Sequence, residues 1–310
     1  MEPTTKHTHF GAISVPLSIF WSDPEKSEYE MISLRSSIQP AKWSKSLDVS
    51  QRLWLVNNVN TSAIFGERVA LLNQQGNWLL IGAVNQRTQR NQFGQVGWVP
   101  TDQVCSNSTY LMEHLSCPEG AICVPKAMLF QNASMSKPLR WLSYQVRLPI
   151  RMEREDYFEV SLPDGCHGYL SRHEMRRSSD LCFSRKNVIA QARQFIGLKY
   201  IWGGTSSYGF DCSGFMFRLY QSQGIYIPRN STSQSQEGLA IGKQNLLPGD
   251  LLFFSTENGK GYIHHVGMYI GNGIMIHAPS SNSEIKETRI DDNPYREEYW
   301  GARRYADYYS

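Results

Sequence analysis

Two segments in the first part of the chain share one pattern, and this repeat limits how that part can fold. Residues 76–81 lead to residues 97–100, and residues 156–160 lead to residues 165–171. Each segment predicts an aromatic-led strand, a turn, and a second strand that opens with glycine followed by aromatic and aliphatic residues. A repeated unit of this kind predicts two small all-β barrels with antiparallel strands.

The two copies differ in length, and the difference lies in a polar insertion. The first copy carries extra polar residues at 86–92, which predict a long hairpin loop that projects from the barrel. Residues 13–21 predict one strand of the first barrel, and the residues from there to about 60 are polar and predict irregular structure. We assign residues 1–104 to the first barrel with an N-terminal extension and residues 105–183 to the second.

The sequence pattern changes at about residue 184, where apolar residues at helical spacing replace the short strand-like segments. Apolar residues at helical spacing predict helices over 187–195 and 213–223, each closed by a glycine. Helices that precede an antiparallel sheet indicate an α+β domain over residues 184–310. The strands predicted for this sheet are 250–254, 263–270, 273–278, 284–290 and 299–305.

Charge and hydropathy exclude some classes of protein and leave the compartment open. The net charge is only +3 and no dense Lys/Arg block occurs, so we expect no nucleic-acid partner. No apolar run approaches 18 residues, so we expect no transmembrane helix. The first residues do not form an intact secretory signal. The sequence therefore allows a cytoplasmic protein or, if a leader has been removed, one of the cell envelope or exterior, and we expect a monomer.

Six cysteines are present, and five of them lie together in the chain, away from Cys212. An even number permits disulfides, but a chain of 310 residues does not need a disulfide scaffold to fold. Free thiols are the simpler interpretation, and pairing stays open. The five cysteines outside the predicted helix start are Cys105, Cys117, Cys123, Cys166 and Cys182.

Cys212 lies at the predicted start of a helix, directly after a glycine- and aromatic-rich loop. A thiol at this position is close to the positive end of the helix dipole and to unpaired backbone N–H groups. Such sites depress a thiol pKa from about 8.5 to roughly 3.5–7.5. We therefore expect a thiolate at neutral pH and a cysteine nucleophile. The structural alternative is a cysteine that only packs at the helix start.

Two histidines on a predicted hairpin could supply the base that Cys212 needs. Side chains alternate along a strand, so His265 and His277 share a face if an odd number of residues, such as 271–273, separates their strands. His264 then points to the other face. His265 would act as the base and His277 would orient it, as in a generalised catalytic triad. Zinc binding by these histidines with Cys212 is the alternative, although the spacing matches no zinc signature and we expect no metal.

Four motifs occur in an order and spacing that point to one family: residues 200–217, 248–251, 265–271 and 276–278. Over roughly residues 185–310 the chain resembles the NlpC/P60 cysteine peptidases, which are papain-like enzymes that cut bacterial cell-wall peptides. The resemblance implies that Cys212, His265 and His277 are the catalytic residues. It also implies that the hydroxyl of Tyr200 helps to hold the oxyanion. No cofactor is implied.

The whole arrangement, two bacterial Src-homology-3-like barrels followed by a papain-like domain, is similar to γ-D-glutamyl-L-diamino acid endopeptidases. The resemblance implies a murein peptide substrate with a free N-terminal L-Ala followed by γ-linked D-Glu. The residues that it implies for the substrate pocket are Asp211, Ser213, Ser231, Trp202 and, from the first barrel, Glu67. A carboxylate beside the nucleophile suits a substrate ammonium group.

Some of these roles have simple alternatives. Asp211 could only cap the helix, and Glu67 could be a surface charge. The expected function is a cysteine endopeptidase that cuts the γ-D-glutamyl–L-diamino acid bond through an acyl-enzyme on Cys212. A cell-wall amidase or acyl transferase with the same triad, and a non-catalytic wall-binding module, are the alternatives. The sequence does not distinguish lysine from diaminopimelate as the diamino acid.

Overall fold

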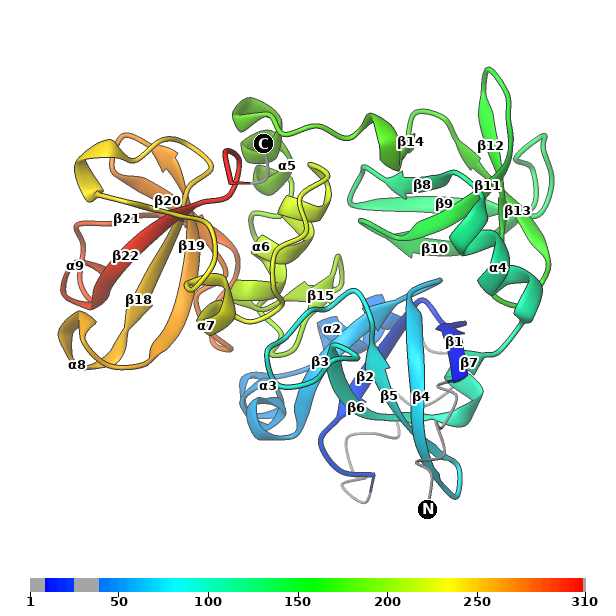
Figure 1. Cartoon of the computed structure of the whole chain (residues 1–310), viewed down its shortest axis with the longest axis horizontal. Coiled ribbons are helices and arrows are strands. Elements are labelled where there is room, and N and C mark those ends of the chain that lie inside the picture. Colours follow the sequence, from blue (N-terminus) through cyan, green and yellow to red (C-terminus); the bar gives the residue numbers. More distant parts are fainter. Residues whose placement is uncertain (1–8, 25–38, 309–310) are drawn as a thin grey trace, which may run out of the picture.

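Three large antiparallel sheets organise the chain, as Figure 1 shows for this computed structural model, which describes residues 9–24 and 39–308. The first two sheets, drawn from blue to green, contain seven strands each. The third sheet contains six strands and lies on the far side of the helices α5 (Arg185–Arg193) and α6 (Cys212–Gln221). The predicted class, two all-β units followed by a papain-like α+β unit, is confirmed.

The first sheet has the strand order β3-β2-β6-β5-β4-β1-β7. In the described part of the chain its outermost strands, β3 and β7, do not pair with each other, so strand pairing does not close the sheet. Its strands are β1 (His9–Ile13), β2 (Leu17–Trp21), β3 (Val59–Ile64), β4 (Arg68–Gln75), β5 (Trp78–Ala83), β6 (Gln95–Pro100) and β7 (Val104–Cys105).

The prediction of one continuous strand over residues 13–21 is wrong. The segment breaks between β1 and β2, which pair with different neighbours: β1 with β4 and β7, and β2 with β3 and β6. Pro16 lies in the break and has no N–H to donate to a neighbouring strand. The prediction of irregular structure up to about residue 60 is also wrong in its described part, because α2 (Pro40–Ser46) and α3 (Val49–Trp54) lie there.

The second sheet repeats the seven-stranded plan and is preceded by α4 (Ser108–Ser116). One apolar core contains buried residues of both N-terminal sheets, such as Leu17 of the first and Leu129 of the second, so the two units pack together. The strands are β8 (Glu119–Ile122), β9 (Lys126–Phe130), β10 (Pro138–Ser143), β11 (Arg147–Glu153), β12 (Tyr157–Ser161), β13 (His167–Ser171) and β14 (Met175–Arg177).

The third sheet has the order β17-β22-β18-β19-β20-β21 and supports the helices beside it. Helix α6 is buried along its whole length and packs on β19, with Phe215 and Val266 in one apolar core. Its strands are β17 (Leu239–Ile241), β18 (Leu251–Ser255), β19 (Ile263–Gly271), β20 (Ile274–His277), β21 (Lys286–Arg289) and β22 (Tyr299–Arg304). The small elements are β15 (Thr205–Ser206), β16 (Gly209–Phe210), α7 (Ser231–Gln234), α8 (Thr256–Gly259) and α9 (Tyr295–Glu298).

A buried ion pair and a hydrogen bond join the N-terminal sheets to α6. The Glu67 carboxylate of the first sheet accepts a hydrogen bond of 2.9 Å from the Arg218 guanidinium of α6, and both side chains are almost fully buried. Arg147 of the second sheet pairs with Glu119 at 2.9 Å and donates to the carbonyl oxygen of Gln221 at 2.8 Å. Both N-terminal units therefore fix the position of the helix that begins at residue 212.

No helix in the described residues is both long and apolar enough to cross a membrane. All six cysteines have free thiols in this structure.

Candidate active site

Cys212 is the first residue of α6, and the cap of this helix is built into the same motif. The Asp211 side chain accepts from the Gly214 N–H at 2.6 Å, so one of the otherwise unpaired N–H groups of the helix is satisfied. A Cβ atom at Gly214 would lie 2.1 Å from the carbonyl oxygen of Gly204, so no side chain fits there. The glycine-rich loop thus packs directly on the helix turn that carries the nucleophile.

The prediction of a depressed thiol pKa is wrong for this structure. Cys212 is 8% exposed, and burial raises the pKa of its thiol to about 12, an effect to which the charge of Asp211 adds. Hydrogen bonds from the backbone N–H groups of Val266 and Ser213 lower the pKa but do not outweigh burial. The thiol is therefore neutral at rest, and a nucleophilic role would require a base to remove its proton.

His265 and His277 meet on one face of the β19–β20 hairpin, as the alternation of side chains predicts. The connection contains two residues, and a bulge between Tyr269 and Gly271 adds the odd residue that keeps the two histidines on the same side. The residue next but one to His265, Gly267, lies against His277, because a Cβ there would be 3.1 Å from His277 Cβ. The pair is therefore diagonal. His264 points the other way and pairs with Glu298 at 3.3 Å.

A chain of hydrogen bonds runs from His265 into the sheet. His265 Nε2 and His277 Nδ1 are 2.8 Å apart, and His277 Nε2 lies 2.9 Å from Thr288 Oγ1 on β21. Burial and the neighbouring histidines His277 and His264 lower the pKa of His265 well below its usual range, and burial lowers the pKa of His277 to about 3. Both imidazoles are therefore neutral at neutral pH.

The hydrogen bonds allow a tautomer that suits a base. If Thr288 accepts from His277 Nε2–H, then His277 Nδ1 accepts from His265 Nε2–H. The lone pair of His265 is then on Nδ1, which makes no hydrogen bond within the described residues. The backbone N–H of the next residue, Val266, contacts the Cys212 sulfur. The contact of Val266 with the sulfur places the strand residue that follows His265 beside the thiol.

Replacing Thr288 with valine, which has the same shape, should lower kcat/KM about tenfold or more, since a buried N–H without an acceptor costs about 1–3 kcal/mol. The alternative tautomer of His277, which puts the His265 proton on the wrong nitrogen, then becomes populated. Imidazole ¹⁵N shifts should show this change, and Thr288→Ser should restore both the tautomer and the activity. Equal activity of the valine variant and the wild type would contradict this role.

Tyr200 and the start of α6 offer two donors for an oxyanion. Burial, with the nearby Cys212 and Asp211, raises the pKa of Tyr200 well above its usual range, so its hydroxyl keeps its proton. Within the described residues this hydroxyl makes no hydrogen bond, nor does the backbone N–H of Cys212 have a backbone partner. A hydroxyl and an N–H beside the nucleophile form a candidate oxyanion hole.

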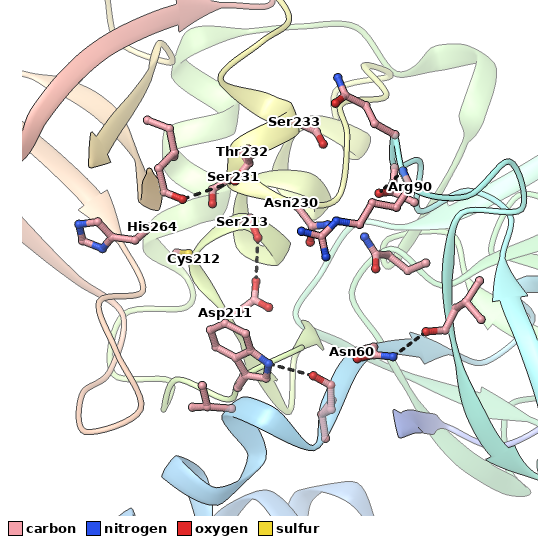
Figure 2. Close-up of a pocket in the computed structure, with 18 of the residues that line it drawn as sticks. Asn60, Arg90, Asp211, Cys212, Ser213, Asn230, Ser231, Thr232, Ser233 and His264 are labelled. Carbon is pink, nitrogen blue, oxygen red and sulfur yellow. Dashed lines mark hydrogen bonds between the residues drawn. The ribbon is translucent and has the colours of Figure 1, made fainter. Parts of the chain in front are cut away.

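A cleft of about 1090 Å³ opens over Cys212 and receives residues from two units (Figure 2). The catalytic unit contributes Tyr200, Trp202, Asp211, Ser213 and Ser231, all predicted from the sequence. The first sheet contributes the opposite wall, which the sequence did not assign to the cleft: Val56, Asn57, Val59, Asn60, Thr88, Gln89, Arg90, Asn91, Gly94, Gln95 and Val96.

The Asp211 carboxylate lines the cleft but already has a cation. Arg229, which is 1% exposed, binds it with both terminal nitrogens, at 3.0 Å to Oδ1 and 2.6 Å to Oδ2. Asp211 Oδ1 also accepts from Gly214 and from the Ser213 hydroxyl at 3.2 Å. Only one acceptor position, on Oδ2, is left for a ligand. Asp211 does cap the helix, and Arg229 balances its negative charge.

Ser231 and Trp202 occupy different parts of the cleft wall. Ser231 is half-buried at the start of α7. The indole of Trp202, 37% exposed, donates from Nε1 to the carbonyl oxygen of Val59 at 2.9 Å and so ties the catalytic unit to the first sheet.

Glu67 is not placed in this cleft. Its Oε2 is occupied by Arg218 and by the backbone N–H of Ile64, both at 2.9 Å, and its environment is the small buried space between the first sheet and α6. The alternative of a surface charge is also wrong, because the residue is 8% exposed. Of the residues predicted for the substrate pocket, the structure therefore places all but Glu67 along this cleft.

The polar insertion of the first sheet forms a loop that docks on the catalytic unit. Arg87 binds Glu237 with two hydrogen bonds of 2.8 Å, and its carbonyl oxygen accepts from the Arg229 N–H at 3.0 Å. Gln89 bonds Gln236 at 2.6 Å. The extra length of the first hairpin at 86–92 was the available signal for this contact.

Across the described residues no group of three or more His, Cys, Asp or Glu side chains is arranged to hold a metal ion.

Cys212 at a buried helix start, with the paired His265 and His277 on the neighbouring sheet, is an arrangement typical of a papain-like cysteine peptidase. The profile of the NlpC/P60 family matches residues 197–304, and that of the YKFC SH3b2 domain matches residues 122–176. The chain is 36% identical over 302 residues to the gamma-D-glutamyl-L-lysine dipeptidyl-peptidase of Bacillus cereus, which covers 94% of this chain and 90% of that protein. The chain belongs to the NlpC/P60 family.

Two further proteins are similar along nearly the whole chain. The gamma-D-glutamyl-L-lysine dipeptidyl-peptidase of Bacillus subtilis is 30% identical over 287 residues, covering 92% of this chain and 95% of that protein. A crystal structure of an NlpC/P60 family protein from Bacillus cereus superposes with a TM-score of 0.90 at 36% identity, covering 96% of this chain and 99% of the other. The similarity therefore includes the N-terminal sheets as well as the peptidase unit.

Proposed function

We propose that the protein hydrolyses the bond between γ-D-glutamate and an L-diamino acid in peptidoglycan-derived peptides with a free N-terminal L-Ala. The observation that carries the proposal is the buried Cys212 beside the His265–His277 pair, in a cleft whose far wall belongs to the first sheet. The names of two relatives, both gamma-D-glutamyl-L-lysine dipeptidyl-peptidases, support the same bond and the release of a dipeptide.

The first half of the reaction forms a thioester. Cys212 Sγ attacks the γ-carbonyl carbon while His265 Nδ1 takes the thiol proton. The carbonyl oxygen becomes an oxyanion that accepts hydrogen bonds from the Tyr200 hydroxyl and the Cys212 N–H. The C–N bond then breaks, and His265 returns the proton to the leaving α-amine of the diamino acid.

The second half releases the dipeptide. Water attacks the thioester carbon and gives a proton to His265, the C–S bond breaks, and the proton returns to sulfur.

Because the resting thiol and imidazole are both neutral, activity should need no charged pair in advance. Protonation of His265 abolishes the base, and the pKa of His265 is lowered. The acid limb of kcat/KM should therefore lie well below pH 6.5.

A free N-terminus fits the shape and chemistry of the cleft. The docked loop of residues 87–95 closes one side of the cleft. This favours a substrate whose N-terminus ends there over one whose chain continues. The remaining acceptor position on Asp211 suits one ammonium N–H, and the amide side chains of Asn57 and Asn60 line the opposite wall.

The experiment is product analysis by mass spectrometry with L-Ala-γ-D-Glu-L-Lys, its diaminopimelate counterpart and an N-acetylated copy. We expect L-Ala-γ-D-Glu and the free diamino acid from the first two peptides and little cleavage of the third. Efficient cleavage of the acetylated peptide would contradict the requirement for a free N-terminus. Cleavage at another bond, or transfer of the acyl group to an added amine in preference to water, would contradict the proposed reaction.

A further inference from the structure

The wall that the first sheet adds to the cleft is positively charged rather than acidic. Three ionisable side chains other than Cys212 and the tyrosines line the cleft in the described structure: Arg90, Asp211 and His264. Asp211 is balanced by Arg229, and His264 faces Glu298. Arg90 makes no ion pair with any described residue, and its side chain is exposed. The charge that the cleft offers to a ligand is therefore one guanidinium.

Arg90 is held on a loop that is fixed at both sides. Before it, Gln86 is fully buried and donates to the Ser62 carbonyl oxygen at 2.7 Å, and Arg87 binds Glu237. After it, the Gln95 N–H donates to the Gln86 carbonyl oxygen at 3.0 Å, which ties the end of the loop to its buried start. These contacts place the backbone of residue 90 against the catalytic unit, so that its side chain reaches the cleft without a rearrangement.

Figure 2 shows Arg90 extending into the cleft from the first-sheet wall toward Asn230, on the side of Ser213. His264 lies on the opposite side of Cys212 in the same view. Hydroxyl and amide groups surround the approach of the guanidinium, and no unbalanced carboxylate of the described residues competes for it. A guanidinium in such a setting binds a carboxylate with paired, charge-assisted hydrogen bonds.

We infer that Arg90 binds the free α-carboxylate of the γ-linked glutamate and so makes the enzyme selective for peptides that carry this group unmodified. The inference rests on the proposed function, and it follows from the chemistry of that bond. A γ-linkage uses the side-chain carboxyl of glutamate, so its α-carboxylate stays ionised a few bonds from the reacting carbon. A peptide with α-linked glutamate, or one in which this carboxyl is an amide, lacks an anion at that place.

The test compares kcat/KM for three tripeptides: L-Ala-γ-D-Glu-L-Lys, the same peptide with the glutamate α-carboxyl as an amide, and the same peptide with the lysine carboxyl as an amide. The wild type should prefer the first over the second by about ten- to a hundredfold, and it should treat the first and third similarly. Arg90→Gln should bring the ratio of the first two close to one, and Arg90→Lys should give an intermediate ratio.

Arg154→Gln is the matched control, since Arg154 is an exposed arginine of the second sheet outside the cleft, and its ratio should equal that of the wild type. Melting temperatures should be unchanged in all variants. The inference is overturned if Arg90→Gln keeps the wild-type ratio, or if it lowers kcat/KM equally for all three peptides. It is also overturned if the wild type distinguishes the first peptide from the third instead, because its preference would then depend on the lysine carboxyl. Failure of the wild type to cut any of the peptides would reject the proposed function itself.

Discussion

Replacing Cys212 with alanine is expected to lower kcat by about four orders of magnitude or more, as removal of a covalent nucleophile does in other peptidases. Substrate binding should change little, because the cleft is formed by other side chains. Cys212→Ser should also be nearly inactive. A serine hydroxyl is harder to deprotonate than a thiol, and the base here is oriented by a neutral histidine rather than a carboxylate.

The measurement is steady-state kinetics with L-Ala-γ-D-Glu-L-Lys, together with calorimetry of peptide binding. Cys182→Ala is the control, since Cys182 is exposed and lies outside the cleft, and it should behave as the wild type. Turnover by the alanine variant within tenfold of the wild type would show that another group is the nucleophile.

Replacing Glu67 with glutamine is expected to cost about 3–5 kcal/mol of unfolding free energy, since it leaves a buried cation without its partner. Arg218 is 1% exposed, and burial lowers its pKa while the charge of Glu67 raises it, so the carboxylate compensates for the buried guanidinium. The pair joins the first sheet to α6, the helix that begins with Cys212. Loss of stability should therefore accompany any loss of activity.

Chemical denaturation followed by tryptophan fluorescence gives the unfolding free energy. Glu113→Gln, which removes one partner of a solvent-exposed pair with Arg151, should cost only about 0–1 kcal/mol. An equal loss in both variants would contradict the structural role of Glu67. A normal stability of Glu67→Gln with a raised KM would instead favour the role in substrate binding that the sequence suggested.

The elements that carry the candidate catalytic residues could be predicted because they depend on local patterns. A cysteine after Asp211 at a helix start, and two histidines on neighbouring strands, are visible in the chain itself. The ionisation of Cys212 could not be predicted, because a helix start is local but the burial that raises its thiol pKa comes from packing across the whole unit. The role of Thr288 depended on the register of β21 against β20, which the sequence does not define.

The wall of the cleft was harder to predict from the sequence, because it forms between segments that are far apart in the chain. Glu67 matched a motif, yet its carboxylate faces α6 and binds Arg218, 151 residues away. The loop with Arg90 could be recognised as an insertion but not as a contact. Missed helices had local signals: Pro40 begins α2, and Asp48 with Gln51 forms a capping box at α3.

The most direct test of the account is to trap the acyl-enzyme on Cys212. Enzyme mixed with L-Ala-γ-D-Glu-L-Lys is quenched in acid at short times, digested and analysed by mass spectrometry. A parallel reaction contains hydroxylamine, which converts a thioester to a hydroxamate. The account predicts an L-Ala-γ-D-Glu acyl group on the peptide that contains Cys212, and the corresponding hydroxamate. Cleavage of the substrate with neither product would contradict it.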